Sequence, residues 1–189
     1  DPYTKDLMTV ALETGCRGGA LRLLLWSDIG PASIVLRPEI TKDREELVIP
    51  ITPAVRKILD RRKMGLDGKE LPADTYVFGN EIGEPVSRRL ANRWWRATCE
   101  AAKIDDLRFH DLRREFGSTL KDLGVPLSDI RDALGHSNVT MTNAYPAAAS
   151  TSATKAYSKL AAHRARQAMK VVVVGSSVAP SVAPRRKRA

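Results

Sequence analysis

The chain has 189 residues, of which 43% are apolar and 28% are charged, and its 31 Lys and Arg against 22 Asp and Glu give a formal net charge of +9. This composition excludes a disordered or fibrous protein and fits one globular domain with a buried core. Two cysteines exclude a disulfide framework, and no apolar run approaches the roughly 18 residues that a membrane span needs. The sequence therefore predicts a cytoplasmic protein without a membrane partner.

The excess positive charge is confined to the C-terminal part of the chain. Nine basic residues and no acidic residue follow position 132, so residues 1–132 are neutral in sum. A neutral region that binds a polyanion must gather its basic side chains on one face when it folds. The net charge alone is therefore weak evidence for binding to nucleic acid.

The pattern of apolar residues and turn residues predicts a mostly helical α+β fold with a small antiparallel β-sheet at the edge. Helices are indicated by apolar residues three and four positions apart, and strands by short β-branched runs. Thr52 before Pro53 marks a helix start, and Gly124 and Gly135 mark helix ends. In chain order, the predicted elements are two helices within 4–26 broken at 15–19, strands at 33–37 and 46–51, and helices at 52–62, 86–103, 110–123, 128–134 and 151–169.

The last part of the chain differs from the rest in composition. Residues 171–189 are rich in Val, Ala, Ser and Pro and end in a basic cluster, which predicts a disordered tail after a single domain at 1–170. Because the chain opens at Asp1 without an initiator Met, we expect it to be a piece of a longer protein.

Residues that carry chemistry gather in the segment 109–145, which reads FHDLRREFGSTLKDLGVPLSDIRDALGHSNVTMTNAY. His110 and Arg113 are three residues apart on a predicted helix whose apolar stripe contains Leu112, so we expect both to face away from the core. His136 follows the predicted helix end, and Tyr145 comes nine residues later.

Four segments together resemble the tyrosine recombinases, also called phage-type integrases. They read TGCRGGALRLLLWSDI (14–29), ITKDREELVIPIT (40–52), RFHDLRREFGS (108–118) and LGHSNVTMTNAY (134–145), and they occur in the order that the family has. The resemblance implies the fold of the DNA breaking-rejoining enzymes and the catalytic domain alone, with the family's N-terminal DNA-binding domain absent from this chain.

The resemblance also implies six catalytic residues. Arg17, Arg113 and His136 would surround the scissile phosphate, Tyr145 would attack it, Lys42 would protonate the leaving oxygen, and His110 would assist proton transfer. Paired guanidiniums can clamp the oxygens of a phosphate as negative charge develops on it, and a general acid is worth roughly 10²–10⁴ in rate. The implied reaction forms a 3′-phosphotyrosine intermediate and needs neither a metal ion nor a cofactor.

Further implications concern partners and rival functions. The family acts on double-stranded DNA and assembles on it as a tetramer through the C-terminal segment, while we expect the free chain to be a monomer. The resemblance favours a site-specific recombinase or integrase of a mobile element. Two alternative functions are a DNA-relaxing enzyme like a type IB topoisomerase and a non-catalytic DNA-binding protein of the same fold.

One residue departs from the family pattern, and two of the catalytic assignments have alternatives. Ala20 stands where the family usually has an acidic residue that orients the active site. Lys42 lies in a charged stretch that is also typical of a solvated hairpin. Tyr3, Tyr76 and Tyr157 are rival nucleophiles only if the family register fails.

An arginine-rich segment at 88–96 lies before the 109–145 segment. Its two tryptophans, Trp94 and Trp95, are interpreted as core residues in preference to base-stacking ones. Its arginines form either a strip that contacts phosphates or a solvated face. These arginines are Arg88, Arg89, Arg93 and Arg96.

Overall fold

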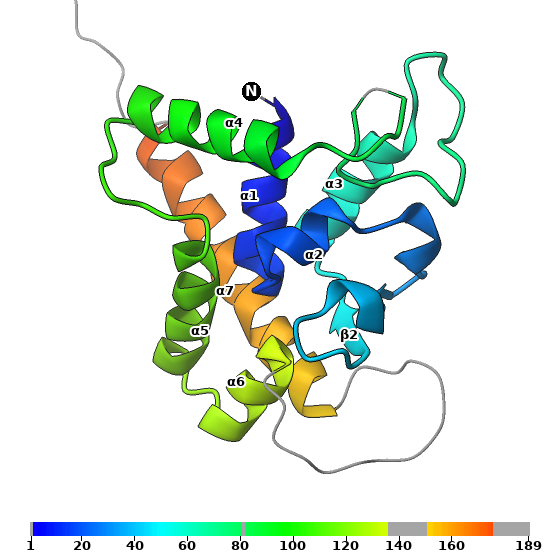
Figure 1. Ribbon diagram of the computed structural model, residues 1–189. Coiled ribbons are helices and arrows are strands. Elements are labelled where there is room, and N and C mark those ends of the chain that lie inside the picture. The colour runs from blue at the N-terminus through cyan, green and yellow to red at the C-terminus, as the bar shows by residue number, and fades with distance from the viewer. Residues whose placement is uncertain (1, 81, 136–150, 176–189) are drawn as a thin grey trace, which may run out of the picture.

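The computed structural model describes residues 2–80, 82–135 and 151–175 (Figure 1). The fold is mostly helical with one small antiparallel sheet, as the sequence predicts. Its elements are α1 (Pro2–Thr14), α2 (Gly18–Arg22), the 3-10 helix η1 (Trp26–Asp28), β1 (Ser33–Leu36), the 3-10 helix η2 (Pro38–Ile40), β2 (Leu47–Pro50), α3 (Pro53–Lys63), α4 (Arg88–Ala101), α5 (Asp111–Asp122), α6 (Leu127–Leu134) and α7 (Thr151–Gly175).

Helix α1 lies at the centre of the molecule and contacts α2, α3, α4 and α5 (Figure 1). Val10 and Ala11 of α1 are fully buried, and they belong to one continuous apolar core that also includes Phe116 of α5 and Leu160 of α7. Helices α2 to α5 thus pack around α1, because an amphipathic helix can bury its apolar side only against another element.

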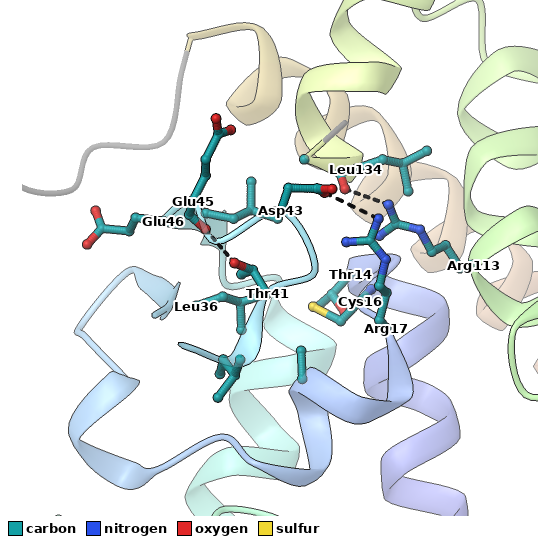
Figure 2. A pocket seen from close by; sticks show the side chains of 14 residues that line it. Thr14, Cys16, Arg17, Leu36, Thr41, Asp43, Glu45, Glu46, Arg113 and Leu134 are labelled. Carbon is teal, nitrogen blue, oxygen red and sulfur yellow. Dashed lines mark hydrogen bonds and ion pairs between the residues drawn. The ribbon is translucent and has the colours of Figure 1, made fainter. Parts of the chain in front are cut away.

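The two strands pair in antiparallel register, with Ile34 opposite Ile49 and Leu36 opposite Leu47. Ile34, Leu36 and Ile49 are buried, so one face of this small sheet packs on the core. The connection between the strands holds η2 and a charged turn at 41–46, which places that turn beside the start of α2 (Figure 2).

The structure confirms several helix starts and ends that the sequence predicts. The Thr52 side chain accepts a hydrogen bond from the Val55 backbone N–H and caps α3. Gly124 follows the end of α5 with φ +68°, and Gly135 ends α6 with φ +59°, a conformation that glycine adopts without steric cost.

The end of the last helix is the main difference from the predicted elements. Helix α7 continues to Gly175, beyond the predicted end at 169, and therefore includes the first residues of the predicted tail. Nothing in the Lys170–Val174 run interrupts a helix, since valine lowers helix propensity only modestly, whereas glycine commonly ends one. The rest of the predicted tail, 176–189, lies outside the described residues.

No helix in the described part of the chain combines the length and apolar character needed to cross a membrane.

Candidate active site

Arg17 and Arg113 meet at one cavity, although they come from different elements (Figure 2). Arg17 is the residue before α2, and Arg113 lies in the first turn of α5. The cavity has about 40 Å³ of free space. Its wall is completed by the end of α1, the end of α6 and the turn between the two strands. From these elements, the lining includes Thr14, Cys16, Ala20, Thr41, Asp43, Leu134 and Gly135.

Arg113 is buried, and only 6% of its surface is exposed. Its Nη1 donates to the backbone oxygen of Gly15 at 2.7 Å, and its Nη2 donates to the backbone oxygen of Leu134 at 2.6 Å. Those two carbonyls belong to the C-terminal ends of α1 and α6, where oxygens lack partners within the helix and carry partial negative charge. One guanidinium thus joins two helix ends and fixes its own orientation.

The expectation that Arg113 faces away from the core is therefore wrong. The apolar stripe of α5 is present as predicted, with Leu112, Phe116 and Leu120 buried. Arg113 lies at the edge of that stripe, and its burial is compensated by the two carbonyls. A guanidinium has five donors, and the contacts within the described part of the chain use two of those of Arg113, which also lines the cavity.

Arg17 completes a pair of cations at the cavity. Its side chain is 30% exposed, and its Nη2 lies 3.5 Å from Oδ2 of Asp43, which comes from the turn between the strands. Burial lowers the pKa of Arg113, and the charge of Arg17 lowers it further. Because the charge of Arg113 is destabilised by burial and by a neighbouring cation, the site favours an anion.

Two predicted site residues do not reach this cavity in the structure. Lys42 is exposed on the turn beside Asp43, and His110 is exposed at the residue before α5; neither lines the cavity. His136 and Tyr145 lie outside the described residues. The roles of these four residues, like the catalytic roles of the two arginines, stay predictions.

Two of the rival tyrosines are fixed in the core. The Tyr157 hydroxyl donates to the Thr14 backbone oxygen at 2.8 Å, and burial raises its pKa well above the ordinary value. The Tyr3 hydroxyl donates to the Phe78 backbone oxygen at 3.1 Å, and burial raises its pKa as well. Neither of them, nor Tyr76, lines the cavity of the two arginines.

Cys16 also lines the cavity, but its surroundings make it a poor nucleophile. Its side chain is 3% exposed, and burial raises the pKa of the thiol to about 11. The thiol stays protonated at neutral pH and acts as a small apolar residue. Across the described residues, no group of three or more His, Cys, Asp or Glu side chains is placed to hold a metal ion.

The arginine-rich helix α4 presents two different faces. Trp95 is buried and its indole N–H donates to the Leu107 backbone oxygen, while Trp94 packs edge-on against Tyr3 at a ring distance of 4.8 Å. Both tryptophans therefore serve the packing of the fold, as predicted. The exposed face carries the four arginines, which line a shallow surface depression. These are Arg88, Arg89, Arg93 and Arg96.

Comparison with known proteins shows the family to which this chain is similar. Residues 1–152 match the model of the Phage integrase family. The chain is 29% identical over 150 residues to the integrase of Salmonella phage P22, covering 75% of this chain and 38% of that protein. It is 31% identical over 151 residues to the tyrosine recombinase XerD of Corynebacterium glutamicum, covering 77% of this chain and 48% of that protein.

Solved structures of lambda integrase have a similar fold. The catalytic core of lambda integrase matches with a TM-score of 0.56 at 23% identity, covering 71% of this chain and 83% of that core. A lambda integrase tetramer bound to a Holliday junction matches with a TM-score of 0.55 at 22% identity, covering 76% of this chain and 44% of that chain. This chain spans less than half the length of the two curated relatives named above. The chain belongs to the Phage integrase family.

Proposed function

We propose that this chain is the catalytic part of a site-specific DNA recombinase that cuts and rejoins DNA strands through a 3′-phosphotyrosine at Tyr145. The observation that carries this proposal is the meeting of Arg17 and the buried Arg113 at one cavity. A phosphodiester gains negative charge as a nucleophile adds, and preorganised guanidiniums stabilise that charge without reorganising at the moment of reaction.

The remaining catalytic groups are assigned by the family pattern and by chain connectivity. Gly135 lines the cavity and is bonded to His136, and Tyr145 follows ten residues after Gly135. Ten residues span up to about 33–36 Å when extended, so the length of the chain allows Tyr145 to reach the phosphate. His136 would bind the phosphate, Lys42 would protonate the leaving 5′-oxygen, and His110 would assist the proton transfer.

Covalent trapping tests the assignment of the nucleophile. The chain is incubated with a pool of nicked duplexes of randomised sequence, in which cleavage releases a short fragment and prevents religation. We expect a denaturant-stable protein–DNA adduct from the parent chain and from Tyr76→Phe, and none from Tyr145→Phe, because a phenyl ring has no attacking oxygen. The adduct is measured on a denaturing gel.

The possible outcomes separate the rival functions. An adduct that persists in Tyr145→Phe would assign the nucleophile elsewhere. DNA binding without any adduct from the parent chain would favour a non-catalytic DNA-binding protein. An adduct that leads to relaxation of supercoiled DNA, with no exchange between two sites, would favour the topoisomerase-like activity.

The exposed face of α4 is proposed as a surface that contacts DNA phosphates. Among the described residues, none of its four arginines forms an ion pair, so their charges are available to a polyanion. We expect binding to a duplex to weaken steeply with salt, and Arg93→Gln to lower the slope of log K against log salt by about one. The matched control is Lys57→Gln on α3, which should leave the slope unchanged. Equal slopes for Arg93→Gln and the parent chain would assign α4 to a solvated face.

We infer that the free chain is a monomer and that it forms a tetramer on DNA. The lambda integrase structure named above is a tetramer on a Holliday junction, which supports the second state. In the free chain, Ala156, Tyr157 and Leu160 of α7 are buried, and this helix contacts α5, α6 and β2 of its own chain. Docking of this helix onto a neighbouring subunit would require the release of those contacts.

A further inference from the structure

The anion that faces the two arginines in the free chain belongs to the protein itself. The Asp43 carboxylate points toward the guanidiniums, whereas Glu45 and Glu46 of the same turn point away from them (Figure 2). Its Oδ2 lies 3.5 Å from Nη2 of Arg17. Its charge also acts on Arg113, whose pKa it raises against the effect of burial. The carboxylate thus pairs with Arg17 and has a weaker effect on Arg113.

The charge balance of the cavity explains why a carboxylate is favoured there. The side-chain hydrogen bonds of Arg113 go to two backbone oxygens, which carry only partial charges. A buried guanidinium beside a second guanidinium is stabilised when a full negative charge lies nearby. In the family, an acidic side chain three residues after the first arginine is usual, but Ala20 occupies that position and its methyl group lines the same cavity.

The space inside the cavity is limited. Its free volume of about 40 Å³ has room for one or two water molecules. A phosphate group has five heavy atoms, so it would compete with a side chain that already lies beside the guanidiniums. Three acidic residues line the cavity, Asp43, Glu45 and Glu46, and Asp43 is the one that contacts Arg17.

The turn that carries Asp43 includes a residue in an unusual backbone conformation. Arg44, the next residue, adopts φ +54°, a left-handed conformation that residues with a Cβ seldom adopt. The Thr41 hydroxyl lies 3.1 Å from the Pro38 oxygen and 2.8 Å from the Glu45 oxygen, which closes the base of the turn. The side chains of Asp43 and Arg17 are 28% and 30% exposed, so their contact can break without opening the core.

We propose that Asp43 is an internal substitute for the scissile phosphate, which holds the two-arginine site in the free chain and leaves when a DNA phosphate enters. This inference rests on the proposed function, because it assigns that site to a phosphodiester. A carboxylate and a phosphodiester both carry one negative charge, so the exchange leaves the net charge of the site unchanged. Lys42 is bonded to Asp43, so a movement of the turn would also move the proposed general acid when substrate binds.

Titration with inorganic sulfate tests the exchange without DNA. Thermal unfolding of the whole chain is followed as sulfate replaces chloride at constant ionic strength. We expect Asp43→Asn to unfold at a lower temperature than the parent chain without sulfate. We also expect its half-maximal response at a sulfate concentration about two- to fivefold lower, since a partly exposed ion pair competes with sulfate by about that factor. Asp43→Ala should behave like Asp43→Asn, which guards against an effect specific to asparagine.

The matched control is Glu39→Gln. Glu39 is an exposed acid in the same connection between the strands, and it does not line the cavity. It should show the sulfate response of the parent chain. Equal sulfate midpoints for Asp43→Asn and Glu39→Gln would overturn the substitution by Asp43.

The test separates this inference from the proposed function. Tighter sulfate binding by Asp43→Asn without a covalent adduct from the parent chain would support the internal anion and reject the recombinase chemistry. An adduct from the parent chain with unchanged sulfate binding in Asp43→Asn would do the reverse. No response to sulfate in either protein would reject the exchange at the two arginines, whereas the covalent adduct alone decides the recombinase chemistry.

Discussion

Replacing Arg113 by lysine is expected to reduce formation of the covalent DNA adduct by about 10²–10³-fold, the usual loss when one donor to a developing oxyanion is removed. The guanidinium of Arg113 performs two tasks with one rigid plane, since it joins the backbone oxygens of Gly15 and Leu134 and faces the cavity beside Arg17. An ammonium is a compact charge on a flexible stem and cannot do both at once.

The same substitution is expected to lower the free energy of unfolding by about 1.5–3 kcal/mol, the range for one hydrogen bond that involves a charged group. The lysine can keep one carbonyl partner and leaves the other without a donor in a buried place. Denaturant unfolding measures this loss, and single-turnover trapping measures the loss of adduct.

The control for Arg113→Lys is Arg114→Lys. Arg114 is the next residue on α5, and its side chain is 76% exposed and pairs with Asp111 three residues earlier. We expect a change below about 0.5 kcal/mol and unchanged cleavage, as for an ordinary surface substitution. Reduced stability of Arg113→Lys with full cleavage would limit Arg113 to a structural role.

Arg113 also illustrates what the sequence could and could not predict. The spacing of Leu112, Phe116 and Leu120 predicts the buried face of α5, because helical periodicity is a local property. The burial of Arg113 depends on two carbonyls from α1 and α6, which are distant in the chain. Arginine is mostly exposed, so periodicity assigns it to the surface. Glycines at the ends of two predicted helices were the available signal, since such ends leave carbonyls that need donors.

The turn at 41–46 shows a similar limit. A run of five charged residues predicts a solvated hairpin, and the sequence contains nothing that distinguishes the charge that faces the cavity from its neighbours. The structure makes that distinction, since Asp43 contacts Arg17 while Lys42 is exposed. The resemblance to the family predicts a role for Lys42, because a lysine at that place in the family acts as a general acid. The contact between Asp43 and Arg17 depends on how α2 and the strands pack, which the sequence alone does not predict.

Gly15 is expected to be the glycine whose replacement is most damaging to the site. It has φ +66°, and a Cβ at this position would lie 2.5 Å from Cδ1 of Phe116 and 3.0 Å from Cδ2 of Leu134. Both contacts are with buried side chains, so neither ring nor methyl group can move into solvent. Gly15→Ala should therefore lower the free energy of unfolding by about 2–5 kcal/mol, combining a left-handed alanine with overpacking of the core.

The effect of Gly15→Ala should extend to the arginine site. The Gly15 backbone oxygen accepts a hydrogen bond from Nη1 of Arg113, so a shift of the backbone here displaces the guanidinium. We expect loss of adduct formation even under conditions where the variant remains folded, as measured by circular dichroism in the cleavage buffer. Misplacement of a catalytic group by about 1 Å can cost about 10²-fold in rate.

Gly19→Ala provides the matched control, since it adds the same methyl group in the same glycine-rich segment. A Cβ at Gly19 would meet no atom within 4 Å, and Gly19 lies inside α2 without a positive φ. Alanine favours a helix over glycine by up to about 1 kcal/mol, so this variant should be as stable as the parent chain or more stable. Equal unfolding midpoints for the two variants would mean that the break between α1 and α2 tolerates a side chain, and that the anchor of Arg113 does not depend on glycine.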